Sequence, residues 1–109
     1  MIGVALAAFV LAQAPQPGAA EALAGLYGRA LGAASECQGI ARERLEAAAQ
    51  AAAAHVKALA KNGAAQQAAG AELARGVDRG SRDVKSGALT CDQAESEFGN
   101  LERDLAASR

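Results

Sequence analysis

Two cysteines, Cys37 and Cys91, have the widest choice of chemistry among the side chains of this 109-residue sequence. A pair of cysteines can form a structural disulfide, act as a redox dithiol or help to hold a metal ion. They lie far apart in the sequence, and neither belongs to a C-x-x-C motif. In an exported protein, an even count of two cysteines is most simply one disulfide. We therefore predict that Cys37 and Cys91 are joined in a structural cross-link.

Cys91 also has a competing interpretation, because it directly follows Thr90, a candidate N-cap of the last predicted helix. A thiol at a helix N-terminus can have a lowered pKa and act as a reactive nucleophile, which would indicate thiol redox activity. The neighbouring acids Asp92 and Glu95 oppose formation of the thiolate. We therefore keep the structural disulfide as the prediction and thiol redox activity as its alternative.

The rest of the chain offers few groups for catalysis or for binding a metal or cofactor. His55 is the only imidazole, and its place at the edge of an apolar helix stripe predicts a partly exposed helix residue. One histidine and two cysteines are too few for a zinc, copper or haem site within one chain. Acid pairs such as Glu95 and Glu97 point to different faces of a helix. We expect no catalytic, metal-binding or cofactor-binding residues, and a protein that is not an enzyme.

The charged residues offer one candidate interaction surface. A net charge of −1 supplies no field that would attract nucleic acid or an anionic membrane, so we expect no nucleic-acid partner. Arg75, Arg79 and Arg82 gather on one side of a predicted helix and could receive an acidic partner or a phosphate group. The alternative is a solvated face supported by ion pairs such as Asp78 to Arg82. The acidic last helix could in turn meet a basic partner.

The N-terminal residues 1–14 form an uncharged apolar run that ends in the small-x-small pattern "AQA". This resembles a secretory signal peptide, although no Lys or Arg precedes the run. Because Pro15 directly follows the pattern, cleavage after Ala19 or Ala20 is an alternative. We predict a periplasmic or secreted protein. A membrane-spanning helix needs about 20 apolar residues, so we expect no stable span unless the leader stays uncleaved.

The chain divides into a leader and one domain. Residues 15–20 contain two prolines and a glycine, the composition of a flexible joint. We therefore assign residues 1–20 to a signal-like leader with its linker, and residues 21–109 to an alanine-rich helical domain.

Residues 21–61 contain no proline and many strong helix formers, so they predict one long helix. A glycine in a helix interior costs up to about 1 kcal/mol relative to alanine, so a kinked or split helix is the alternative. Four glycines bear on this choice: Gly25, Gly28, Gly32 and Gly39. Asn62 and Gly63 then predict the end of this helix and a reversal of the chain.

Residues 64–85 predict an amphipathic second helix. Its larger apolar residues share one face: Leu73, Val77 and Val84. Gly70 and Gly80 lie near that face, and a helix tolerates glycine where another backbone comes close. The alanine-rich first helix would supply that close partner.

Residues 91–107 predict a third helix that begins with a capping box formed by Thr90 and Gln93. Its inward-facing residues repeat at spacings of three and four: Cys91, Ala94, Phe98, Leu101 and Leu105. This spacing places Cys91 in the same interface as Phe98.

Together these elements predict an all-α fold, either an antiparallel helical hairpin or a three-helix arrangement. If the second and third helices return alongside the first, Cys91 comes within about one helical turn of Cys37. Large apolar residues are few, so we expect a thin core that needs a staple. The disulfide would contribute about 4 kcal/mol, comparable to the net stability of many small domains.

The predicted function is that of an interaction or accessory subunit in the bacterial periplasm, acting through a protein partner or self-association. An apolar leader, a small alanine-rich helical domain and two distant cysteines are similar in outline to small exported bacterial proteins, including acid-stress chaperones of the periplasm. This resemblance implies the alternative of a stress chaperone that exposes an apolar helix face. Thiol redox activity is the third hypothesis.

Overall fold

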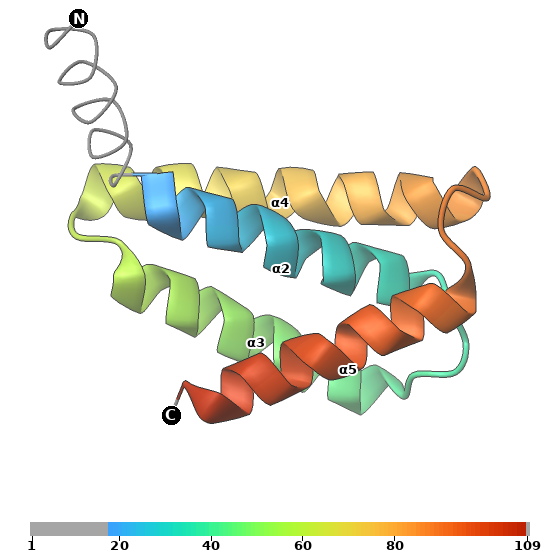
Figure 1. Ribbon diagram of the computed structural model, residues 1–109. Helices are drawn as coiled ribbons and strands as arrows, with labels where there is room; N and C mark the ends of the chain where they lie inside the picture. Colours follow the sequence, from blue (N-terminus) through green and yellow to red (C-terminus); the bar gives the residue numbers. More distant parts are fainter. Residues whose placement is uncertain (1–17, 109) are drawn as a thin grey trace, which may run out of the picture.

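The computed structural model describes residues 18–108, and these residues form four helices: α2 (Ala19–Ser35), α3 (Arg42–Leu59), α4 (Gly63–Lys85) and α5 (Cys91–Ala107) (Figure 1). The predicted all-α class is confirmed. The predicted leader and the linker up to residue 17 lie outside the described residues. Ala19 and Ala20, assigned to that linker, belong to α2, so the helical domain begins earlier than predicted.

The single helix predicted over residues 21–61 is divided into α2 and α3 by the loop 36–41. This loop buries the side chains of Cys37 and Ile40, which are 7% and 9% exposed. Helix propensity amounts to only a fraction of a kcal/mol per residue, so burial and the cross-link of Cys37 outweigh it. The carboxylate of Glu95 lies over Gly39, in the space that a Cβ there would occupy.

Successive helices run in opposite directions, so α2 and α4 run parallel to each other (Figure 1). The reversal predicted at Asn62 and Gly63 is confirmed, but both residues serve the start of α4, since α3 ends at Leu59. The side-chain oxygen of Asn62 caps α4 by accepting a hydrogen bond from the Ala65 N–H at 2.8 Å. Consecutive helices are thus antiparallel, whereas α4 packs along α2 in the parallel sense.

The contact between α2 and α4 is made by glycine. A Cβ at Gly32 of α2 would collide with the carbonyl group of Val77, and a Cβ at Gly80 of α4 would collide with the carbonyl oxygen of Arg29. Gly28 and Gly76 are equally constrained by backbone atoms of the facing helix. At each position one glycine Hα stands where the Cβ would be and points at the facing backbone, an arrangement that permits Cα–H···O contacts.

α2 is the central helix and contacts α3, α4 and α5. Its Tyr27 and Leu31 meet Val56 of α3 and Phe98 and Leu101 of α5 in the main core. Alanine is the commonest of the buried apolar residues. The core is therefore as thin as predicted, and the close helix spacing compensates for the small side chains.

The last helix has the predicted bounds and capping box, but the prediction that Cys91 shares an interface with Phe98 is wrong, because Cys91 is exposed and Cys37 belongs to a separate apolar cluster. The Thr90 hydroxyl accepts a hydrogen bond from the Gln93 N–H at 3.1 Å, and the Gln93 side chain accepts one from the Thr90 N–H at 3.0 Å. Gly87, with φ of 84°, makes the left-handed turn that ends α4. Four residues of the predicted stripe are buried: Ala94, Phe98, Leu101 and Leu105.

The glycine contact predicts opposite effects for two glycine substitutions. Gly32→Ala should lower the free energy of unfolding by about 1–3 kcal/mol, because the added methyl group forces α2 and α4 apart. Gly70→Ala is the matched control, since no atom of a neighbouring residue lies within 4 Å of its Cβ position. It should raise stability by up to about 1 kcal/mol through helix propensity. Urea unfolding of both variants tests the pair, and equal effects of the two substitutions would contradict the close contact.

Candidate functional site

Cys37 and Cys91 are joined by a disulfide, with the two Sγ atoms 2.14 Å apart and the Cα atoms 5.6 Å apart. The predicted cross-link is thus confirmed. The route to it differs from the single long hairpin expected from the sequence. The chain reverses three times, and the end of α2 and the start of α5 then lie at the same end of the bundle (Figure 1).

The two sulfurs have different surroundings. Cys37 is buried in a second apolar cluster with Ala33, Leu89 and Ala94. Cys91, the first residue of α5, is exposed. Both cysteines of the described chain are in this bond. The disulfide therefore anchors the loop after α2 to the start of α5, close to Ala34 and Ile40 of the main core.

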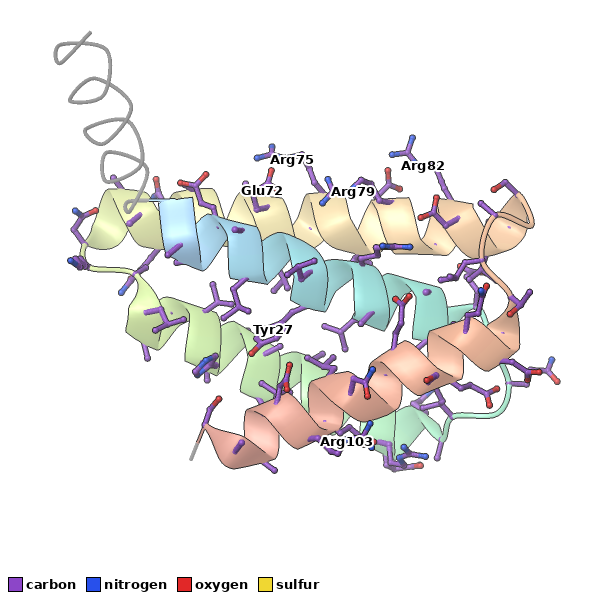
Figure 2. The ribbon with its side chains drawn as sticks, viewed as in Figure 1. Tyr27, Glu72, Arg75, Arg79, Arg82 and Arg103 are labelled. Atoms are coloured by element: carbon purple, nitrogen blue, oxygen red, sulfur yellow. A yellow bond between two sulfur atoms is a disulfide. The ribbon has the colours of Figure 1, made fainter. Side chains whose placement is uncertain are left out.

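The predicted arginine surface lies along α4. Figure 2 shows Arg75 and Arg82 pointing away from the bundle, whereas Arg79 lies across the ribbon of α4. Arg75 pairs with Glu72 at 2.6 Å, and Arg82 pairs with Asp78 at 3.0 Å, the pairing that the spacing predicted. Acidic residues of α4 thus neutralise the charge of two of the three arginines.

Arg79 differs from its two neighbours in the row. No acidic side chain within residues 18–108 pairs with it at 4.0 Å or less. Its Nη2 atom lies 3.2 Å from the place that a Cβ on Gly25 would occupy. The guanidinium of Arg79 therefore reaches from α4 over α2, where an oxygen of Glu72 also lies, 3.5 Å from the same place.

An ion pair joins α3 to α5. Arg44 donates two hydrogen bonds to the Glu102 carboxylate, from Nε at 3.2 Å and from Nη2 at 2.6 Å. The same guanidinium lies 5.4 Å from the ring centre of Phe98. The hydrogen bonds from Arg44 hold the pKa of Glu102 below its usual range. Acid should therefore weaken the contact between α3 and α5.

Tyr27 and His55 face each other between α2 and α3, with ring centres 6.0 Å apart. Figure 2 shows Tyr27 pointing from α2 toward α3 and α5. Burial raises the pKa of Tyr27, and the carboxylate of Asp104 raises it further. His55 is half-buried on α3, the position that the sequence predicted for it.

A groove of about 420 Å³ lies between α3 and α4. Its walls include Ala53 and Val56 of α3 and Gly70 and Leu73 of α4, with polar groups such as Lys57, Gln66 and Gln67 at the rim. The space beside Gly70 is open, because no atom of a neighbouring residue lies within 4 Å of its Cβ position. The groove is thus apolar along its walls and accessible from solvent.

Sequence reasoning missed this groove because it assigned the wrong residues of α4 to the contact with the first helix. Leu73, Val77 and Val84 were expected to make that contact. The close approach predicted at Gly80 is confirmed, whereas the one predicted at Gly70 is wrong because the space beside it is open. Gly76 and Gly80 make the contact, and they leave Leu73 half-buried and Val77 36% exposed at its edge. The signal was present in the spacing of these two glycines, which equals that of Gly28 and Gly32.

A second, smaller hollow of about 170 Å³ lies between α2 and α5. Leu23, Tyr27 and Leu101 line it, with Glu97 and Asp104 on its α5 side. Leu26 also lines this hollow and is 65% exposed. It is the most exposed large apolar side chain within residues 18–108.

Comparison with protein-family models, with curated proteins and with solved structures found no match for this chain. Within the described residues, no three His, Cys, Asp or Glu side chains come together as a metal site. None of α2 to α5 is long and apolar enough to cross a membrane.

The disulfide should supply a large part of the stability. Cys91→Ser removes the bond at its exposed end and frees an unfolded loop with a sequence separation of 54 residues. The expected loss is about 4 kcal/mol in the free energy of unfolding, enough to unfold part of the population at room temperature. Denaturant unfolding followed by circular dichroism measures this loss. Wild-type protein in excess reductant is the control and should match the variant; a variant as stable as the oxidised wild type would contradict the role of the staple.

The Arg44–Glu102 pair predicts an acid-sensitive component of stability. Because the folded-state pKa of Glu102 is lowered, its contribution is present above the ordinary value of 4.5 and is lost as the pH falls through the folded pKa. Glu102→Gln should therefore reduce stability at pH 7 and flatten its decline below pH 4.5. Glu43→Gln, an exposed change at the start of α3, is the control. Thermal melts between pH 3 and 7 test this, and parallel curves for wild type and Glu102→Gln would refute it.

Proposed function

We propose that this chain is an exported, non-enzymatic interaction subunit that binds a partner protein in the groove between α3 and α4. The observation that carries the proposal is the open apolar groove itself. Leu73, which is half-buried, lines it together with Val56, which is 3% exposed, and Gly70 leaves room for close approach of another chain. Exposed apolar grooves of this kind mark protein-binding sites.

The form of the groove favours an amphipathic helix as its occupant. Its two walls are helices, and apolar anchors on one face of a third helix would pack between them. Ala53 and Gly70 are small, so the backbone of the bound helix can come close. Lys57, Gln66 and Gln67 at the rim would donate hydrogen bonds to acidic or amide side chains flanking those anchors.

The compartment we propose is the periplasm or the extracellular space. Support comes from the disulfide, because such bonds persist in oxidising compartments and are rare in the cytosol. The signal-like residues 1–14 add a second argument from the sequence.

Site-specific photo-crosslinking in cells tests the groove. A photoreactive amino acid at Gly70 or Ala53 lies in the groove, whereas one at Ala58 is exposed elsewhere on α3. Gly70 and Ala53 should yield cross-links to one common protein, which mass spectrometry identifies, and Ala58 should not. Absence of cross-links from both groove positions, or the same products from all three positions, would reject the proposed site.

The stress-chaperone alternative is favoured by one observation, the acid-sensitive Arg44–Glu102 pair between α3 and α5. Its loss below pH 4.5 would loosen the cover over Phe98, which is fully buried in the folded chain. A chaperone of this kind would suppress aggregation of client proteins at acid pH alone. Inert behaviour toward clients at both acid and neutral pH would remove it. Thiol redox activity requires that Cys91 react with alkylating reagents before reduction, and resistance to them would remove that hypothesis.

A further inference from the structure

We infer that the exposed side of α2, centred on Leu26, binds a second copy of this chain. This inference goes beyond the proposed function, because the surface involved is on the other side of α2 from the groove. Gly28 of α2 faces the backbone of α4 at Leu73, Gly76 and Val77, and Leu73 also lines the groove. Leu26 is two residues from Gly28 and hence about 200° away around the helix.

The first observation is the apolar centre of this surface. Leu26 is 65% exposed and stands beside the hollow lined by Leu23, Tyr27 and Leu101. An exposed leucine at the centre of the surface can pack against its own counterpart across a two-fold axis, as a symmetric interface requires.

The second observation is the charge on the two sides of this centre. On the α5 side, the carboxylates of Glu97 and Asp104 line the hollow. On the α4 side, the guanidinium of Arg79 reaches over Gly25, where one carboxylate oxygen of Glu72 also lies. The other oxygen of Glu72 pairs with Arg75, and Arg79 pairs with no acid within residues 18–108 at 4.0 Å or less. The apolar centre on α2 thus has one unpaired guanidinium on one side and two carboxylates on the other.

These charges select one symmetry. A two-fold axis that runs along α2 places α4 of one copy over α5 of the other and keeps positions along the helix at the same level. Arg79, near Gly25, then meets Asp104, which lines the hollow with the neighbouring Leu23 and Tyr27. A two-fold axis across α2 would place Arg79 against Arg79, which is repulsive. We therefore assign the dimer with parallel α2 helices, in which Leu26 of one copy packs against Leu26 of the other.

The symmetry also leaves both α3–α4 grooves free. Each groove lies on the side of its α2 that faces away from the second copy, so the dimer would present two binding sites. The contact surface is small and its ion pairs are near its edge. We expect a weak dimer whose formation decreases as salt concentration rises.

Sedimentation velocity over a wide concentration range, with circular dichroism to check folding, tests the dimer. Wild type should shift from monomer to dimer as its concentration rises, and Leu26→Glu should remain monomeric. Leu59→Glu is the matched control, because Leu59 is also an exposed leucine, 47% exposed, but belongs to α3. It should dimerise as wild type does. A folded Leu26→Glu variant that still dimerises would overturn the assignment, as would wild type that stays monomeric at every concentration.

Charge reversal tests the symmetry. Arg79→Glu and Asp104→Arg should each weaken the dimer at least tenfold, and the double variant should recover most of the lost affinity because both ion pairs form with reversed sign. A folded double variant no better than either single variant would reject the parallel arrangement.

The groove and the dimer are tested independently. Cross-links from Gly70 that persist in the monomeric Leu26→Glu variant support the groove alone. A dimer that forms without cross-links from the groove supports binding of the second copy alone. Cross-links from Ala22 on α2 to an unrelated protein, with no dimer, would assign this surface to another partner.

Discussion

The close backbone contact between α2 and α4 is the constraint on which the rest of this structure depends. Gly28 and Gly32 on one helix meet Gly76 and Gly80 on the other, with backbone atoms where side chains would normally stand. Each glycine weakens its own helix by up to about 1 kcal/mol relative to alanine. The fold offsets this cost with many short contacts between two long helices, and dispersion attraction depends steeply on such distances. A chain with few large apolar residues can form a stable core in this way.

Both candidate surfaces result from that contact. Because glycine rather than Leu73 and Val77 fills the α2–α4 contact, these larger residues lie at its edge, and Leu73 lines the α3–α4 groove. Because α2 buries most of its circumference against three helices, its remaining side exposes Leu26. The disulfide completes the arrangement at the other end, where it joins the loop after α2 to the start of α5. The α2–α4 contact, the Cys37–Cys91 disulfide and the two exposed surfaces thus follow from the same arrangement of the four helices.

The sequence predicts local features of this fold well. Three predictions are correct: the capping box at Thr90, the buried stripe through Phe98 and the Cys37–Cys91 bond. The first two depend on residue chemistry and spacing within one helix, and the third depends on the even number of cysteines. The continuity of residues 21–61 is wrong, because helix propensity takes no account of the tertiary burial of Cys37 and Ile40. The α3–α4 groove could not be predicted from hydrophobic periodicity, which assigns the largest apolar residues of a helix to its contact. Here the smallest residues make the contact, and the divergence of α3 from α4 appears only once four helices pack together.

The most direct measurement of this account is a set of nuclear Overhauser effects from the glycine Hα protons of α2 in isotope-labelled, oxidised protein. A parallel, glycine-mediated contact predicts cross-peaks from Gly28 to Leu73 and Gly76, and from Gly32 to Val77. Absence of these cross-peaks in a folded sample, or cross-peaks that pair Gly32 with residues earlier in α4 than those paired with Gly28, would contradict it.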